Sequence, residues 1–254
     1  MTHHNAYANQ PVSTPVAKWD WLQSRAQPIE ECGEPLVSMG LIPEKILVSS
    51  QYFVQLLDGA LPDIFCRESV FTRLLAATEQ LPAGCRFVVY DCWRPVQVQQ
   101  SLFNKMKEEM GHNNPGKTDA ELTDMALVYV ALPSFDPLKP SPHNTGGAID
   151  LSIVGPDGQP LNMGGGYDAA EEYSATMFFE NKLQAGEKLT PAETEACENR
   201  RLLYAVMTQA GFTSYVDEWW HFDYGNQNWA WASGAKAAIY GRSRPVFPWN
   251  KDIA

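Results

Sequence analysis

The loop and strand at residues 141–154 combine two side chains that can bind a metal ion. Proline, asparagine and glycine residues mark a loop around His143, and the alternating, β-rich run that follows carries Asp150. This alternation predicts a strand that turns Ile149 toward the core and Asp150 toward the opposite face. Neutral imidazole and carboxylate are ligands that suit Zn²⁺. His143 and Asp150 alone would also fit an ordinary hydrogen bond between a loop histidine and a strand aspartate.

A second segment, residues 217–223, adds a histidine in an aromatic setting. His221 follows Glu218 by three positions, with two tryptophans between them. Three protein ligands beside an unligated glutamate form the usual catalytic zinc site, in which the glutamate acts as general base. Because residues three apart in an extended strand lie on opposite faces, we expect a bulge or a strand end between Glu218 and His221. The alternative, on these residues alone, is an aromatic core strand with a buried histidine.

Together the two segments resemble the zinc D-alanyl-D-alanine dipeptidases of the vancomycin-resistance type. The similarity rests on Ser-x-His-x-x-Gly-x-Ala-x-Asp, which begins at Ser141, and on Glu-Trp-Trp-His, which begins at Glu218. Further blocks follow the order of the family: Asp-Cys-Trp-Arg-Pro at 91–95, Met-Gly-Gly-Gly-Tyr-Asp at 163–168 and Asn-Arg-Arg at 199–201. Several independent blocks in one order are a more specific signal than any single motif.

The resemblance implies a catalytic role for several of these residues. One zinc ion per chain would be held by three ligands: His143, Asp150 and His221. Glu218 would take the proton from the attacking water and return it to the leaving amine. Arg94 matches the arginine that stabilises the tetrahedral intermediate, a role that suits its forked and permanently charged donor set. Asp91 would orient Arg94 from behind.

Three of the site residues also have a plainer interpretation or a purely inferred role. In isolation Arg94 is typical of a solvated arginine, or of one that is salt-bridged to Asp91. By resemblance, Ser141 would lie near the carboxylate of the substrate. Asp168 would lie near the ammonium group of the substrate, although a loop-capping aspartate fits equally well. The glycines before Asp168 lack the Lys-Ser/Thr of a phosphate-binding loop, which argues against nucleotide binding.

The function implied by the resemblance is zinc-dependent hydrolysis of a D,D-dipeptide, such as D-alanyl-D-alanine, by a metal-activated water. One alternative is a zinc D,D-carboxypeptidase that acts on cell-wall stem peptides, which would need an open groove and usually export. Another is a non-catalytic zinc-binding module, but a structural zinc site is closed and needs neither Glu218 nor Arg94. The chain departs from the family around residues 46–53, where the segment that grips the amino end of the dipeptide is poorly matched, and in its tryptophan-rich tail.

Composition limits the partners and the compartment. The chain has 254 residues, a net charge of -11 and 44% hydrophobic residues, which indicates an acidic globular protein rather than one that binds nucleic acid or anionic membranes. No signal peptide or membrane-spanning run is recognisable in the sequence. The five cysteines are scattered without a CxxC pair, which favours reduced thiols. We therefore expect a cytoplasmic enzyme whose partner is a small dipeptide.

The order of strand and helix signals predicts an α+β fold, a single domain with a mostly antiparallel central sheet flanked by helices. We expect a lead-in of uncertain fold over residues 1–45 and a catalytic domain over residues 46–254. Strands are expected at 46–48, 85–90 and 148–154, and helices at 68–80, 96–110, 119–127 and 190–210. The polar stretch 171–189 is expected to form a mobile cover, and the aromatic tail after residue 222 to pack across the core.

Overall fold

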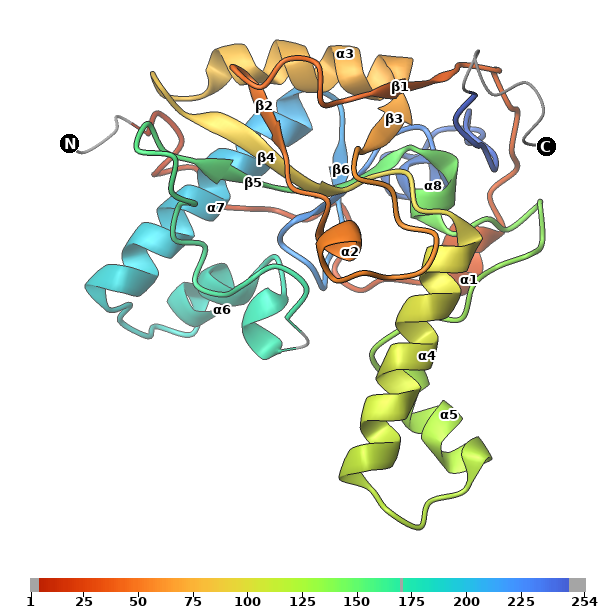
Figure 1. Ribbon diagram of the computed structural model, residues 1–254. Coiled ribbons are helices and arrows are strands. Elements are labelled where there is room, and N and C mark those ends of the chain that lie inside the picture. Colours follow the sequence, from red (N-terminus) through yellow and green to blue (C-terminus); the bar gives the residue numbers. More distant parts are fainter. Residues whose placement is uncertain (1–4, 170, 247–254) are drawn as a thin grey trace.

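The computed structural model describes residues 5–169 and 171–246, and its centre is a five-stranded sheet (Figure 1). The strand order is β2 (Ile46–Val48), β4 (Arg86–Asp91), β5 (Ala148–Val154), β7 (His221–Asp223) and β6 (Thr213–Ser214). Strands β2 and β4 are parallel, and the other neighbours are antiparallel. A separate antiparallel pair is formed by β1 (Leu36–Ser38) and β3 (Phe65–Arg67). The predicted α+β fold with a mostly antiparallel sheet is confirmed.

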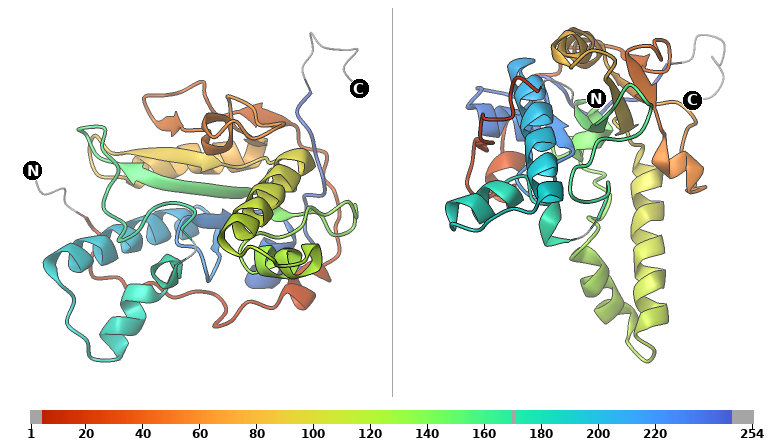
Figure 2. Two further views of the ribbon diagram at one scale, coloured as in Figure 1. Left: turned by 60° about the horizontal axis from the view of Figure 1, so that its bottom comes forward. Right: turned by 90° about the vertical axis from the view of Figure 1, so that its left-hand side faces the viewer.

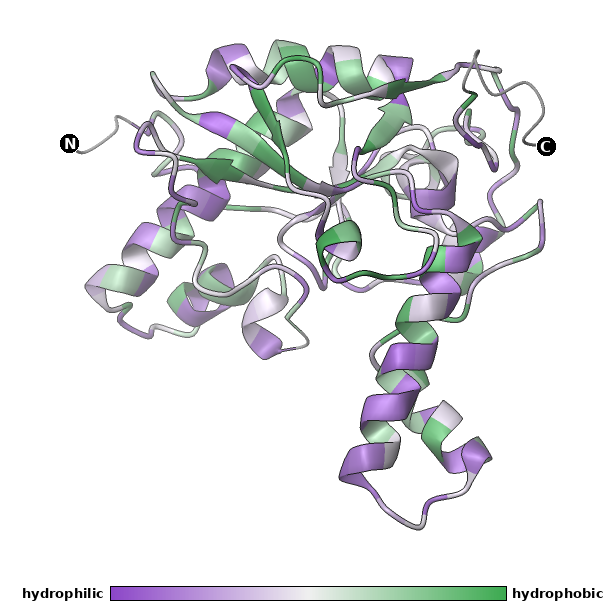
Figure 3. Cartoon of the chain, in the orientation of Figure 1, coloured by the Kyte–Doolittle hydropathy of each residue, from purple (hydrophilic) through white to green (hydrophobic). Residues whose placement is uncertain are grey.

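The main core lies between the sheet and two helices, α3 (Glu68–Ala77) and α7 (Pro191–Gln209). Aliphatic residues of all three elements are buried in one cluster, among them Leu74, Leu203, Ile149, Leu151 and Ile153. Figure 3 shows the same concentration of hydrophobic residues along the central strands. Alternate residues of β5 therefore face the core, as the sequence predicts, and Asp150 is left on the other face.

Helix α7 begins and ends at the predicted signals. Thr190 and Glu193 form a capping box, in which each side chain accepts a hydrogen bond from the backbone of the other. Gly211 follows the helix with a φ of 93°, a left-handed conformation that ends the helix without strain. The expected helix at 190–210 is confirmed.

Helices α4 (Val96–Asn113) and α5 (Asp119–Leu127) lie side by side and project from the rest of the chain as an arm (Figure 2). Pro95 precedes the first turn of α4, and a capping box of Thr118 and Glu121 begins α5. Helix α3 continues into the 3-10 turn η1 (Thr78–Gln80). In the ranges 5–169 and 171–246, none of the helices combines the length and apolar composition that a membrane crossing requires.

The lead-in packs against later parts of the chain. It contains α1 (Trp21–Arg25) and β1, and Ile29 forms a parallel bridge with Ala238. The ring of Trp19 lies 4.9 Å from that of Trp231 in α8 (Gln227–Ser233), with an edge-to-face geometry. The described part of the lead-in thus adds one strand and one short helix to the fold.

Residues 171–189 form a packed helical segment, in contrast to the expected mobile cover. The segment contains η3 (Glu172–Ser174) and α6 (Phe178–Gln184). Phe179 is buried against Ala196 and Cys197 of α7, and the carboxylate of Glu180 accepts hydrogen bonds of 2.7 and 2.9 Å from Arg201. The buried ring of Phe179 and the paired carboxylate of Glu180 fix this segment to α7, although its polar composition suggested a mobile segment.

In the tail, Tyr224 and Tyr240 join the core as expected, and residues 247–254 lie outside the described residues.

Candidate metal centre

The pairing of β5 with β7 brings two of the predicted metal ligands together. In this antiparallel pair Asp150 lies directly opposite His221. Side chains of directly opposed residues share one face of a sheet, so the two side chains meet on the face that is turned away from the core. Nδ1 of His221 lies 3.0 Å from Oδ1 of Asp150. Strand register, rather than sequence proximity, therefore joins two residues that are far apart in the chain.

His143 comes from the 3-10 turn η2 (Pro142–Thr145), which leads directly into β5. Its Nε2 lies 3.5 Å from Oδ2 of Asp150. The turn ends at Gly146, whose φ is 73°, and a Cβ atom at this position would lie 2.4 Å from the side chain of Leu36. Only glycine fits this left-handed and crowded position, so Gly146 lets the chain reverse directly behind His143.

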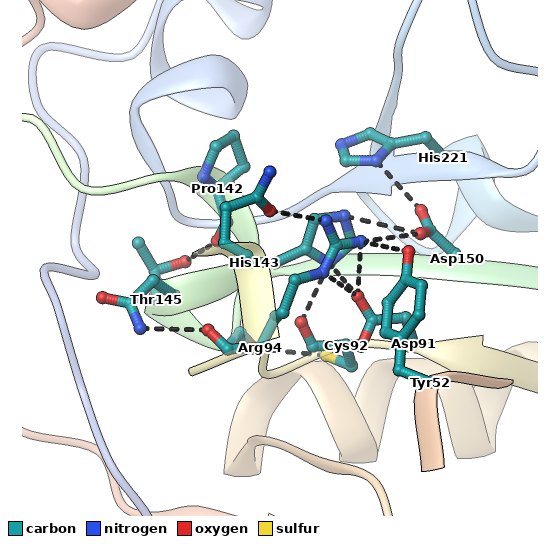
Figure 4. A network of polar contacts seen from close by, with 12 residues as sticks. Tyr52, Asp91, Cys92, Arg94, Pro142, His143, Thr145, Asp150 and His221 are labelled. Atoms are coloured by element: carbon teal, nitrogen blue, oxygen red, sulfur yellow. Dashed lines mark hydrogen bonds and ion pairs between the residues drawn. The ribbon is translucent and has the colours of Figure 1, made fainter. Parts of the chain in front are cut away.

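The three residues form a cluster whose spacing suits a metal ion. One ligand atom from each of His143, Asp150 and His221 lies within 4.8 Å of the others, and all three residues are buried (Figure 4). Tetrahedral zinc ligands at about 2.0–2.1 Å from the ion are roughly 3.3 Å from one another. The separations of 3.5 and 3.0 Å between Asp150 and the two imidazoles are close to that value. The donor set and its spacing therefore fit a zinc ion.

Each imidazole has an acceptor on the ring nitrogen that points away from the cluster. Nδ1 of His143 lies 2.9 Å from the carbonyl oxygen of Cys92, and burial lowers the pKa of His143 to about 3, so the neutral ring keeps a lone pair on Nε2. Nε2 of His221 lies 3.1 Å from Oδ2 of Asp223. Burial disfavours a charged His221, but Asp223 and Asp150 outweigh it and raise the pKa of that imidazole. The two carboxylates beside the His221 ring therefore favour positive charge at this position.

Glu218 lies beside the cluster without joining it. The backbone N–H of His221 donates to the carbonyl of Glu218 at 3.2 Å, so Glu218 belongs to a turn and β7 begins at His221. This confirms the expected strand end. Oε2 of Glu218 lies 3.7 Å from Nδ1 of His221, and 40% of the Glu218 side chain is open to solvent. Desolvation by the surrounding protein raises the pKa of the Glu218 carboxyl to about 7, partly opposed by His221 and reinforced by Asp150.

A β-bulge at the end of β4 turns Asp91 toward the same site. Val89 pairs with Leu151, but Asp91 pairs with Asp150, so Tyr90 is an extra residue in β4. A strict alternation would place Asp91 on the core face with Val89, and the bulge restores it to the face that carries Asp150. Burial raises the pKa of Asp91 to about 7, with Arg94 opposing and Asp150 reinforcing the shift.

Arg94 pairs with Asp91 and also lies beside the proposed metal ligands. Its Nε donates to Asp91 at 2.8 Å, so it is salt-bridged as the plainer interpretation requires. Its Nη2 also lies 3.7 Å from Oδ2 of Asp150, so the same guanidinium faces the metal ligands. Gln99 accepts a further hydrogen bond, from Nη1 at 2.8 Å. The guanidinium is therefore fixed in orientation beside the cluster.

Two tyrosines of the site were not identified from the sequence. The hydroxyl of Tyr52, in α2 (Gln51–Val54), accepts a hydrogen bond from Arg94 at 2.9 Å and lies 3.1 Å from the hydroxyl of Tyr167. Tyr167 donates in turn to Oδ2 of Asp150 at 3.3 Å. Tyr52 is joined to the site by the sheet topology: strands β2 and β4 are parallel, so the residues that follow them, Tyr52 and Arg94, emerge at the same edge of the sheet.

Ser141 and Asp168 are close in sequence to residues of the site. Ser141 is the half-buried residue that precedes η2, two positions before His143. Asp168 follows Tyr167 and has a left-handed φ of 61°. Desolvation raises the pKa of Asp168 to about 6, with Arg94 opposing and Asp150 reinforcing the shift, although its side chain remains exposed.

Comparisons with known proteins agree with the geometry of the site. A family model described as D-ala-D-ala dipeptidase matches residues 62–233. A D-alanyl-D-alanine dipeptidase of Synechocystis is 30% identical over 235 residues, which cover 85% of this chain and 95% of that protein. A D-alanyl-D-alanine dipeptidase of Escherichia coli is 31% identical over 141 residues, which cover 56% of each chain.

Among solved structures, one that matches does so at a much lower level of identity. It is a mutant of the vancomycin-resistance D,D-pentapeptidase VanY in complex with Zn(II), at 18% identity and a TM-score of 0.33. The match covers 74% of this chain and 89% of that one. So weak a structural likeness supports no argument about this chain.

Proposed function

Because the chain belongs to the D-ala-D-ala dipeptidase family, we propose that it hydrolyses a D,D-dipeptide such as D-alanyl-D-alanine with a bound zinc ion. The observation that carries this proposal is the convergence of His143, Asp150 and His221, whose ligand atoms lie within 4.8 Å of one another. These three residues would hold the ion. When bound, zinc lowers the pKa of a water molecule and polarises the carbonyl of the scissile peptide bond.

Glu218 acts as general base and then as general acid. It lies 3.7 Å from a proposed ligand and is partly open to solvent, so it can reach a water molecule at the site. It accepts a proton as this water attacks the peptide carbonyl and returns the proton to the leaving amine. A raised pKa suits this double role because it allows both proton uptake and proton release near neutral pH.

Arg94 stabilises the negative charge that develops on the attacked carbonyl oxygen. Its guanidinium cannot lose its proton, and Asp91, Tyr52 and Gln99 hold it in one orientation before the substrate arrives. Donors that are oriented in advance need no reorganisation when charge develops, which is the main benefit of such an arrangement.

The two charged ends of a dipeptide lie close together, so a small site can recognise both. Ser141 would contact the carboxylate end, and the carboxylate of Asp168 would contact the ammonium end. The five cysteines are free thiols, which fits a reducing compartment, and we propose that the protein acts on free dipeptide in the cytoplasm. Recovery of the activity with a membrane or exported fraction after cell fractionation would argue against that location.

A peptide panel tests the proposed substrate class. We expect rapid hydrolysis of D-alanyl-D-alanine, because both of its charged ends can be recognised. N-acetyl-D-alanyl-D-alanine lacks the ammonium group, and we expect its kcat/KM to be lower by at least about 10-fold, the loss from one charge-assisted hydrogen bond. A pentapeptide that ends in D-alanyl-D-alanine serves as the competing substrate. Efficient release of its last residue would instead indicate a D,D-carboxypeptidase.

A further inference from the structure

A buried aspartate lies behind one of the proposed metal ligands. Asp223 follows His221 by two positions in β7, so both side chains lie on the same face of the strand. Asp223 is fully buried, with no exposed surface, and its Oδ2 lies 3.1 Å from Nε2 of His221. The proposed mechanism assigns no task to this carboxylate.

The other neighbours of Asp223 are both hydrogen-bond donors. Nδ2 of Asn226 donates to Oδ1 at 2.5 Å, and Nδ2 of Asn228 donates to Oδ2 at 3.2 Å. The side-chain oxygen of Asn226 accepts a hydrogen bond from the backbone N–H of Trp229, and that of Asn228 accepts one from the hydroxyl of Ser24. Each amide therefore turns its NH₂ group toward Asp223. The carboxylate is therefore enclosed by three donors, and the third is the ring of His221.

This arrangement determines which nitrogen of His221 is available to a cation. Each ring nitrogen of His221 faces a carboxylate: Nε2 faces Asp223 and Nδ1 faces Asp150. Asp150 belongs to the ligand cluster and Asp223 does not, so a metal ion held by the cluster would take the lone pair of Nδ1. The proton of the neutral ring then stays on Nε2, where the carboxylate of Asp223 accepts its hydrogen bond. Nδ1 of His143 lies 2.9 Å from the backbone carbonyl oxygen of Cys92 and 3.2 Å from Oδ2 of Asp91, so a backbone group shares the corresponding role there with a carboxylate.

We propose that Asp223 is a positioning residue that holds His221 with Nε2 protonated and Nδ1 turned toward the metal. The proposal rests on the metal site described above and assigns Asp223 no contact with substrate. The hydrogen-bonded chain continues from Asp223 through Asn228 to Ser24 in α1. Carboxylates behind metal-binding histidines fix the tautomer and the ring orientation in the same manner.

Zinc affinity is the first readout, measured by competition with a chelator of known affinity. Asp223→Ala removes the acceptor, and we expect zinc to bind about 10–100-fold more weakly. Ser24→Ala is the matched control, because it shortens the same chain at its far end and leaves the bond from Asp223 to His221 in place. A near-ultraviolet circular dichroism spectrum like that of the wild type would show that Asp223→Ala is folded. Affinity within 2-fold of the wild type in folded Asp223→Ala would overturn the proposal.

The second readout needs no substitution at Asp223. In zinc-loaded, ¹⁵N-labelled wild-type protein, long-range ¹H–¹⁵N spectra should assign the ring proton of His221 to Nε2 and the metal to Nδ1. A metal-bound Nε2 would refute the proposal even if Asp223→Ala failed to fold.

His221→Ala separates this inference from the proposed function. If His221→Ala bound zinc normally, the metal site itself would be wrong, whereas loss of zinc there with normal binding by Asp223→Ala would overturn only the role of Asp223.

Discussion

Glu218→Ala is expected to keep its zinc ion and its fold while losing about 10²–10⁴-fold in the rate of D-alanyl-D-alanine hydrolysis. The reason is that Glu218 lies beside the three proposed ligands, partly exposed, and transfers protons without holding the metal. Zinc content and hydrolysis rate, measured on the same preparation, test this directly. Glu218→Gln is the matched variant, because it keeps the size of the side chain and removes only its basicity.

The two measurements separate three roles for Glu218. Zinc retained with activity lost supports the general base. Zinc lost in step with activity would make Glu218 a fourth ligand, and retention of both would show that Glu218 has no role in the reaction.

Arg94→Lys is a useful comparison, since it keeps the charge and loses the forked guanidinium that Asp91 and Gln99 orient. It should also keep zinc, with a loss of about 10²–10³-fold in kcat.

The second large effect is expected at the ligands themselves. His143→Ala and His221→Ala should each lose stoichiometric zinc, and their hydrolysis should fall to the background rate, because two protein ligands do not retain the ion at a catalytic site. His112→Ala is the control, since His112 is an exposed histidine in the last turn of α4. Zinc content after exhaustive dialysis is the measurement. Full zinc in purified His143→Ala would remove His143 from the site.

The metal cluster could be predicted from the sequence because its parts are local motifs. His143 and Asp150 are separated by one turn and half a strand, and the glycine at 146 indicated the reversal between them. The turn at Glu218 was also predictable, since an extended chain cannot place Glu218 and His221 on one side. What the motifs could not give was the register that sets Asp150 opposite His221.

The supporting residues depend on long-range geometry, and for that reason most of them were missed. Tyr52 reaches Arg94 only because β2 is parallel to β4. Asp91 was expected to orient Arg94, but the bulge at Tyr90 that turns Asp91 toward the site could not be predicted. Asp223 is a partial exception. Its spacing of two from His221 places both on one strand face, a pattern that the sequence already contained.

The lead-in and residues 171–189 were poorly predicted for a different reason. Their strands and helices are short, so apolar residues recur too few times to reveal a period. Strand β1 has only three residues and is stabilised by pairing with β3. Similarly, α6 contains charged residues whose partners, such as Arg201 for Glu180, lie on another helix. Their composition alone therefore did not predict regular secondary structure.

The proposed hydrolysis of a free D,D-dipeptide depends on a zinc ion held by His143, Asp150 and His221. It is tested by the release of D-alanine from D-alanyl-D-alanine by the wild-type protein before chelation, after chelation and after zinc is returned. We expect hydrolysis to fall to background when the metal is removed. Activity should return in proportion to added zinc and saturate at about one ion per chain. Undiminished hydrolysis by protein with no detectable metal would contradict the proposal.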